Sequence, residues 1–146
     1  MSGSPGIALR RPAPLAELAA MMAALSPDIL IGKAGVFGLA ARHRSLTRSW
    51  GAWDGDVCIA CGGLAPAGDG VLEAWFACQP RAARRLVPLA RAMRLTLETI
   101  AETERVAIRA RVAAGHEPGR RLAKLAGFHP LGAAAGVETW EKPCPT

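Results

Sequence analysis

The chain has 146 residues, which suits one domain, and 51% of them are hydrophobic, enough for a buried core without disulfides or metals. Eighteen Lys and Arg against 12 Asp and Glu give a formal net charge of +6, which favours anionic partners such as nucleotide phosphates, nucleic acid or acidic protein surfaces. Charged residues interrupt every apolar stretch near the N-terminus and no signal peptide precedes the four cysteines. We therefore expect no membrane span, no secretory leader and a cytoplasmic location.

The first third of the chain carries the weakest signals. Residues 1–6 are small and turn-forming and are predicted to be a flexible leader before one domain over residues 7–146. Ile7–Arg10 is predicted to be a strand, and the apolar stretch Leu15–Leu25 a helix that Ser26-Pro27 ends. Three glycines weaken any helix in residues 28–48, whose role the sequence does not reveal.

Three apolar runs separated by turn residues predict a β-meander in the middle of the chain. Ser49–Trp53 and Val57–Leu64 flank the turn Asp54-Gly55-Asp56, the pattern of a β-hairpin. A second turn at residues 66–70 leads to a third strand, Val71–Cys78.

The second half alternates helix and strand. After a loop at residues 79–85, apolar residues at three- and four-residue steps predict the strongest helix, 86–101. Period-two alternation predicts a strand over Arg105–Val112, and Pro118 begins a short helix whose end Gly127 marks. A final strand pair, His129–Leu131 and Val137–Glu141, flanks a Gly/Ala-rich turn.

The element order β-α-(α)-β-β-β-α-β-α-β-β and the helix ending Leu125-Ala126-Gly127-Phe128 resemble the GNAT superfamily of acetyl-CoA-dependent N-acetyltransferases. The resemblance implies a single GNAT-like domain of the α/β (α+β) class. It would have a central mixed, mostly antiparallel sheet of six to seven strands flanked by about four helices. Gly62-Gly63-Leu64-x-Pro66, Glu73-Ala74-Trp75 and the Gly127-Phe128 ending look like the small GNAT-like morphogenesis proteins of tailed phages.

The resemblance also implies where acetyl-CoA would bind. Backbone amides at the end of the third meander strand, at Phe76, Ala77 and Cys78, would bond the pantetheine arm, and a glycine-rich loop before the long helix would hold the pyrophosphate. In this chain the loop contains no glycine, and Pro88 removes one donor. Two interpretations stay open for its three arginines: guanidinium groups that replace the amides as phosphate ligands, or a solvated basic turn. These arginines are Arg81, Arg84 and Arg85.

The candidate catalytic residues are Glu73 and His116. Many GNAT enzymes place a tyrosine where this chain has Ala123, and the chain has no tyrosine. His116 lies near a family asparagine and has the pKa range of an acid or base, but it is also a helix-entry residue. Glu73 matches a glutamate that acts as a general base in some GNAT enzymes, and a neighbouring tryptophan would raise its pKa; alternatively it pairs with Arg109 or Arg111.

Cys58-Ile59-Ala60-Cys61 has the spacing of half a zinc site or of a redox pair. No second pair of ligands exists, and strand alternation points the two thiols apart. We therefore expect buried core cysteines and no metal site.

Three functions remain. The leading prediction is a phage or prophage-type GNAT-fold protein with a degenerate acetyl-CoA site, located in the host cytoplasm or the virion. It would serve in virion assembly with other phage structural proteins or as a homo-oligomer. The first alternative is an active acyl-CoA-dependent N-acetyltransferase with an arginine-lined phosphate loop. The second is a basic nucleic-acid-associated protein, although the sequence contains no recognisable nucleic-acid-binding motif.

Overall fold

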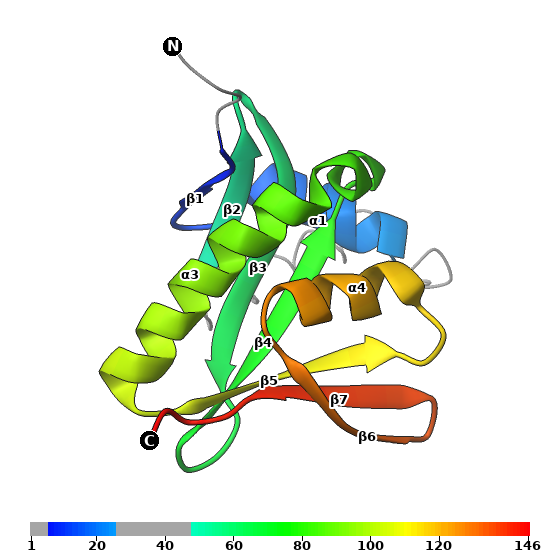
Figure 1. Cartoon of the computed structure of the whole chain (residues 1–146). Helices are drawn as coiled ribbons and strands as arrows, with labels where there is room; N and C mark the ends of the chain where they lie inside the picture. The colour runs from blue at the N-terminus through cyan, green and yellow to red at the C-terminus, as the bar shows by residue number, and fades with distance from the viewer. Residues whose placement is uncertain (1–5, 26–47) are drawn as a thin grey trace. The chain divides into compact units, whose positions relative to one another are not determined.

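The computed structural model of the chain describes residues 6–25 and 48–146 (Figure 1). Its strands form one seven-stranded mixed sheet in the order β1-β2-β3-β4-β5-β7-β6. Three α-helices and one 3-10 helix, η1, complete the described part of the chain. In chain order the elements are β1 (Ala8–Arg10), α1 (Leu15–Leu25), β2 (Arg48–Asp54), β3 (Val57–Pro66), β4 (Val71–Cys78), η1 (Pro80–Arg85), α3 (Leu86–Glu104), β5 (Ala107–Ala113), α4 (Glu117–Leu125), β6 (His129–Ala134) and β7 (Val137–Lys142).

This architecture agrees with the expected α/β sheet of six to seven strands. The predicted leader lies almost wholly outside the described residues. The same holds for residues 28–48, for which the sequence predicts no structure or role. None of the described helices is long and apolar enough to cross a membrane.

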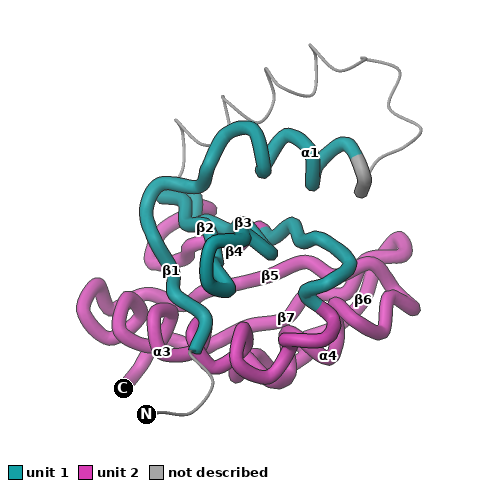
Figure 2. The backbone as a smooth tube through the Cα atoms, turned by 90° about the horizontal axis from the view of Figure 1, so that it is seen from above, with its two compact units in different colours: residues 1–65, 76–82 teal, residues 66–75, 83–146 magenta. Residues whose placement is uncertain are grey.

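The chain divides into two compact units, residues 1–65 with 76–82 and residues 66–75 with 83–146 (Figure 2). In the first unit β1 pairs antiparallel with β2, and β2 with β3. Gly55, with φ +64°, makes the two-residue β2–β3 turn, as expected for a hairpin. The amide of Ala13 donates to Ser49 Oγ at 3.0 Å, which fixes the segment before α1 on this hairpin.

A β-bulge in β3 changes which side chains share a face. Ala52 pairs with Ala60 but the next residue, Trp53, pairs with Cys58, so Ile59 is an extra residue in β3. The extra residue shifts the alternation by one position, and Cys58 and Cys61 therefore lie on the same face. Their sulfur atoms are 3.9 Å apart. The expectation that alternation separates the two thiols was wrong, although both are buried as expected.

In the second unit β4 runs parallel to β5, while β5 pairs antiparallel with β7 and β7 with β6. Helices α3 and α4 contact each other and β5, and Figure 2 shows both on one side of β5 and β7. The strand side chains on this side form the core, among them Ile108, fully buried, and Trp140, 5% exposed. The opposite side of β5 carries Arg109 and Arg111, both largely exposed.

Two predicted boundaries differ in the structure, and one predicted loop is helical. The strand after α3 begins at Ala107 rather than Arg105, because Arg105 is the C-cap of α3 in a left-handed conformation, φ 58° and ψ 53°. The β6–β7 turn narrows to Ala135-Gly136, both with positive φ, so β6 extends to Ala134. The loop before α3 is the 3-10 helix η1.

Candidate functional site

The end of β4 leads directly into the arginine-rich segment. The parallel register with β5 covers only the first half of β4, from Val71↔Ala107 to Ala74↔Ala110. The second half extends past the last of these pairs and contains three predicted pantetheine-binding residues: Phe76 and Cys78, half-buried, and Ala77, 3% exposed. At the end of the strand the amide of Gln79 donates to the carbonyl of Ile59 at 2.9 Å.

The 3-10 helix η1 occupies the position of the expected phosphate loop. A 3-10 helix closes backbone bonds between residues three apart, as the 3.0 Å bond from the Ala82 amide to Gln79 O shows. None of the residues of η1 has the positive φ that lets amides form an anion cradle. Phosphate groups bound at η1 would therefore have to be held by side chains.

The arginines of η1 are placed for that purpose. With three residues per turn, Arg81 and Arg84 lie one above the other on the same side of η1, and both are exposed. In the described part of the chain neither forms an ion pair. Arg85 is less exposed and serves as the N-cap position of α3.

The N-terminus of α3 adds a favourable field for an anion. No side chain caps it and its first turn holds no acidic residue, so the positive end of the helix dipole and the arginine charges have the same sign. Pro88 lies in that first turn, where amides have no helical partner. Pro88 therefore removes no hydrogen bond from the helix, but it leaves one backbone amide fewer to bind a ligand.

Glu73 forms an ion pair on the side of the sheet opposite α3 and α4. Its Oε1 lies 3.5 Å from Arg111 Nε, while Arg109 bonds Glu141 at 2.8 Å. The two side chains of the first pair are 39% and 68% exposed, so the Glu73 carboxylate is solvated rather than desolvated. Of the two partners expected for Glu73, the structure shows Arg111.

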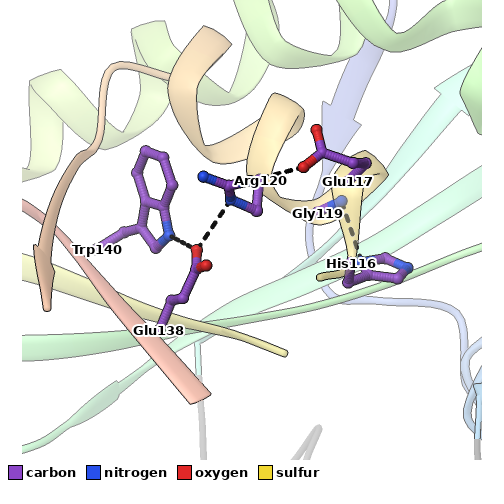
Figure 3. A network of polar contacts seen from close by, with 6 residues as sticks. All are labelled: His116, Glu117, Gly119, Arg120, Glu138 and Trp140. Carbon is purple, nitrogen blue, oxygen red and sulfur yellow. Dashed lines mark hydrogen bonds and ion pairs between the residues drawn. The ribbon is translucent and has the colours of Figure 1, made fainter. Parts of the chain in front are cut away.

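His116 is the N-cap residue of α4. Its Nδ1 accepts a hydrogen bond of 3.1 Å from the amide of Gly119 (Figure 3). A Cβ at Gly119 would lie 2.6 Å from that nitrogen, so the glycine makes the cap possible. The helix-entry role of His116 is thus visible in the structure, and a role in proton transfer stays a prediction.

A polar network that sequence reasoning missed ties α4 to β7. The carboxylate of Glu138 accepts from Arg120 Nε and from Trp140 Nε1, each at 3.1 Å, and Arg120 also bonds Glu117 at 2.6 Å (Figure 3). The short-range pair of Glu117 and Arg120 follows from helical spacing. The bond from Arg120 to Glu138 depends on how α4 packs on β7, which no spacing in the sequence reveals.

Lys142 is a second missed residue. It is 6% exposed; its Nζ donates to Ala126 O at 2.9 Å and lies 3.7 Å from Glu98 Oε1. Burial lowers the pKa of this amine, while the charge of Glu98 raises it. Gly127, with φ +93°, leaves space for the amine: a Cβ there would lie 2.6 Å from Nζ.

No group of three or more His, Cys, Asp or Glu side chains within residues 6–25 and 48–146 is arranged to hold a metal ion.

No protein-family model and no curated protein matches the sequence. Solved structures do match its fold. A GNAT-family acetyltransferase from Bacillus anthracis has a TM-score of 0.72 at 9% identity, over 97% of this chain and 96% of that one. The chain has the GNAT fold.

Two further solved structures with this fold are complexes with coenzyme A or acetyl coenzyme A. The PaiA N-acetyltransferase from Thermoplasma acidophilum, in complex with coenzyme A, has a TM-score of 0.69 at 15% identity over 95% of this chain and 99% of that one. The N-acetyltransferase PseH from Campylobacter jejuni, in complex with acetyl coenzyme A, has a TM-score of 0.62 at 10% identity over 94% and 98%. Nothing in the structure or in these comparisons supports the expected likeness to phage morphogenesis proteins.

Proposed function

We propose that this protein binds an acyl-CoA and transfers its acyl group to an amine, holding the cofactor phosphates with arginine side chains. The observation that carries the proposal is the GNAT fold over almost the whole chain, shared with N-acetyltransferases whose structures contain CoA or acetyl-CoA. The arginines of η1 give the fold an anion-binding group where the glycine loop is missing.

The side chains of η1 fit the phosphates of the cofactor, but its backbone does not. Arg81 and Arg84 stack on one side of η1, and two guanidinium groups provide forked, charged donors that suit phosphate oxygens. The backbone of η1, in contrast, bonds to itself. Phosphate binding by this chain therefore depends on side-chain charge and should weaken steeply with salt.

Proton transfer falls to Glu73 in this proposal. The amine nucleophile must lose a proton as it attacks, and the exposed Glu73 carboxylate is able to accept it directly or through a water molecule. Arg111 Nε, 3.5 Å from Glu73 Oε1, pairs with this carboxylate and orients it. Ala123, buried in α4, offers no acid for the departing thiolate, so solvent protonates it.

A second candidate function is a GNAT-fold assembly protein without transfer activity. The self-bonded backbone of η1 and the absence of a proton donor at Ala123 favour it. Such a protein would show no response to acyl-CoA.

The test is a thermal-shift and calorimetric titration with acetyl-CoA and CoA. We expect wild type to be stabilised, because a ligand that binds only the native state raises its stability. Arg81→Ala with Arg84→Ala should weaken binding about tenfold or more, since charge-assisted hydrogen bonds are lost. Arg91→Ala, an exposed arginine within α3, is the matched control and should bind like wild type.

The titration separates the two candidates. No stabilisation of wild type at millimolar acetyl-CoA would refute the proposal and favour the assembly protein. Binding that survives loss of both arginines would place the phosphates elsewhere. With an amine panel and chromatographic detection of CoA, Glu73→Gln should lower turnover and leave CoA affinity unchanged.

A further inference from the structure

The bulge in β3 creates a buried dithiol in the first unit. Cys58 and Cys61 are 3% and 1% exposed, and their sulfur atoms are 3.9 Å apart, close to van der Waals contact. The Cys58 thiol also lies 3.2 Å from Ala60 O, to which it donates. Two thiols in contact on one strand are not needed for packing alone, because any apolar pair of similar size would fill the same space.

The opposite strand leaves room for the pair. Gly51 pairs with Cys61 across the β2–β3 ladder, and a Cβ at Gly51 would lie 3.3 Å from Cys58 Sγ and 2.7 Å from Pro14 Cδ. The negative charge of Glu17 in α1 opposes ionisation of both thiols, but its effect on their pKa values is smaller than that of the hydrogen bond between them. Gly51 thus lies between Cys58 and Pro14, the residue directly before α1, and its missing side chain leaves space for both.

The two thiols are chemically unequal. A hydrogen bond from Cys61 lowers the pKa of the Cys58 thiol, with the Ala60 carbonyl as a further contact and burial acting in the opposite direction. The same hydrogen bond, together with burial, raises the pKa of Cys61. The 3.9 Å contact allows either sulfur to donate; with Cys61 as the donor, Cys58 is the thiol that ionises first. A low-pKa thiol in contact with a second thiol is the arrangement of an attacking and a resolving cysteine, here in the core rather than at the surface.

We propose that Cys58 and Cys61 are a modification site for hydroperoxides, at which the two thiols close to a disulfide. The Cys58 thiolate attacks the outer oxygen of the peroxide; the O–O bond breaks, the alcohol or water leaves, and Cys58 becomes a sulfenic acid. The Cys61 sulfur then attacks the Cys58 sulfur, the S–O bond breaks, and hydroxide leaves as water with the Cys61 proton. One peroxide is reduced by two electrons and two thiols are oxidised to one disulfide.

Closure moves the backbone at a defined place. The sulfur atoms must approach from 3.9 Å to about 2.05 Å, and the strand residues between them are the bulge residue Ile59 and Ala60. The carbonyl of Ile59 accepts the amide of Gln79, the residue directly before η1. A disulfide that pulls on Ile59 therefore pulls on the start of the arginine-rich segment. This step rests on the proposed function: the oxidised chain should bind acyl-CoA more weakly than the reduced chain.

The experiment treats the full chain carrying Cys144→Ser with graded hydrogen peroxide, then measures intact mass and maps peptides. Cys144 is the exposed thiol and its removal suppresses cross-linking between chains. We expect a loss of about 2 Da that maps to a Cys58–Cys61 link and is reversed by dithiothreitol. Adding Cys61→Ser is the matched control: it cannot close, so Cys58 should gain about 16 Da and react with dimedone.

Two results would overturn the site. One is a dithiol that stays reduced at peroxide doses that oxidise Cys144 in wild type to the sulfonic acid. The other is a loss of about 2 Da that maps to Cys78. The mass of the Cys144→Ser chain decides the question even if the Cys61→Ser control does not fold.

The link to acyl-CoA is measured separately, by titrating CoA into the reduced and the oxidised chain. Weaker binding after oxidation, restored by dithiothreitol, supports the link through Gln79. Equal binding in both states refutes the link and leaves the disulfide standing. Absence of binding in both states refutes the proposed function alone.

Discussion

At the scale of single residues, Lys142 shows how a charge is accommodated in a core. Its amine donates to the carbonyl of Ala126 at the end of α4, lies 3.7 Å from Glu98 of α3, and stands 5.6 Å from the centre of the Phe128 ring. Burial outweighs these contacts and lowers the pKa of the amine below its ordinary value of 10.5. Folding thus disfavours the charged form of Lys142, although the amine donates to a carbonyl and lies near a carboxylate.

The pH dependence of stability tests this balance. The relevant pH range lies between the lowered pKa of Lys142 in the folded state and its value of 10.5 in the unfolded state. In this range the unfolded chain binds more protons than the folded chain, so the free energy of unfolding increases as the pH rises. Lys142→Met keeps the side-chain volume and removes the proton. We expect urea unfolding to give a small difference between the two proteins at pH 7, within about 1 kcal/mol, and a shift in favour of wild type toward pH 10. A difference that stays constant with pH contradicts this prediction.

His116 tests whether a residue caps a helix or transfers protons. Its Nδ1 accepts the Gly119 amide, so His116→Ala should cost about 1 kcal/mol of stability, the usual effect of losing an N-cap. His116→Asn restores a cap acceptor and should recover most of that loss. If His116 only caps, CoA release by His116→Asn equals that of wild type in an acyl-transfer assay. Loss of turnover in both variants, with stability restored in the second, would assign it to catalysis.

At the scale of elements, α3 ends on a residue in an unfavourable backbone conformation. Arg105 adopts φ 58° and ψ 53°, and its amide bonds Ala101 O. Glycine reaches this left-handed conformation without the steric cost that a Cβ imposes.

Arg105→Gly should therefore stabilise the protein, by about 0.5–1 kcal/mol. Arg91→Gly, at an exposed position in the middle of the same helix, should lose about 1 kcal/mol because glycine is a poor helix former. Thermal or urea unfolding of the two variants checks the opposite signs. Destabilisation by both would mean that the Arg105 side chain contributes more than its backbone strain.

The elements also show where sequence reasoning reaches its limit. Hydrophobic periodicity located α1 over Leu15–Leu25 and β4 over Val71–Cys78 at their observed bounds, because burial of one face sets both patterns. The bulge at Ile59 escaped prediction, since an extra residue in a strand depends on the register with its partner. The 3-10 form of η1 escaped it too, because a run of arginines and alanines is compatible with loop, 3-10 helix and α-helix.

At the scale of the whole molecule, the element order and the Leu125–Phe128 helix ending were enough to predict the GNAT fold. The candidate site was predicted less completely: the sequence located the arginines of η1 but not the 3-10 helix that contains them, and it found Glu73 but left its partner open. The partner of a charged side chain is set by ion pairs across strands or between helix and strand. These pairs join residues that are far apart in the chain, so sequence patterns do not reveal them. The net charge of +6 does not reveal which arginines are free, and several of them form ion pairs with carboxylates. These are Arg94, Arg109, Arg111 and Arg120.

The end of α4 has a consequence for how this sequence can change. Gly127 is required once by its backbone, at φ +93°, and a second time by the Lys142 amine that occupies the space of its missing Cβ. Substituting Lys142 by a shorter residue removes the second requirement but not the first. Position 142 can therefore change during evolution or redesign, whereas position 127 must remain glycine. We expect the Gly127-Phe128 pair to be retained in variants that have lost Lys142.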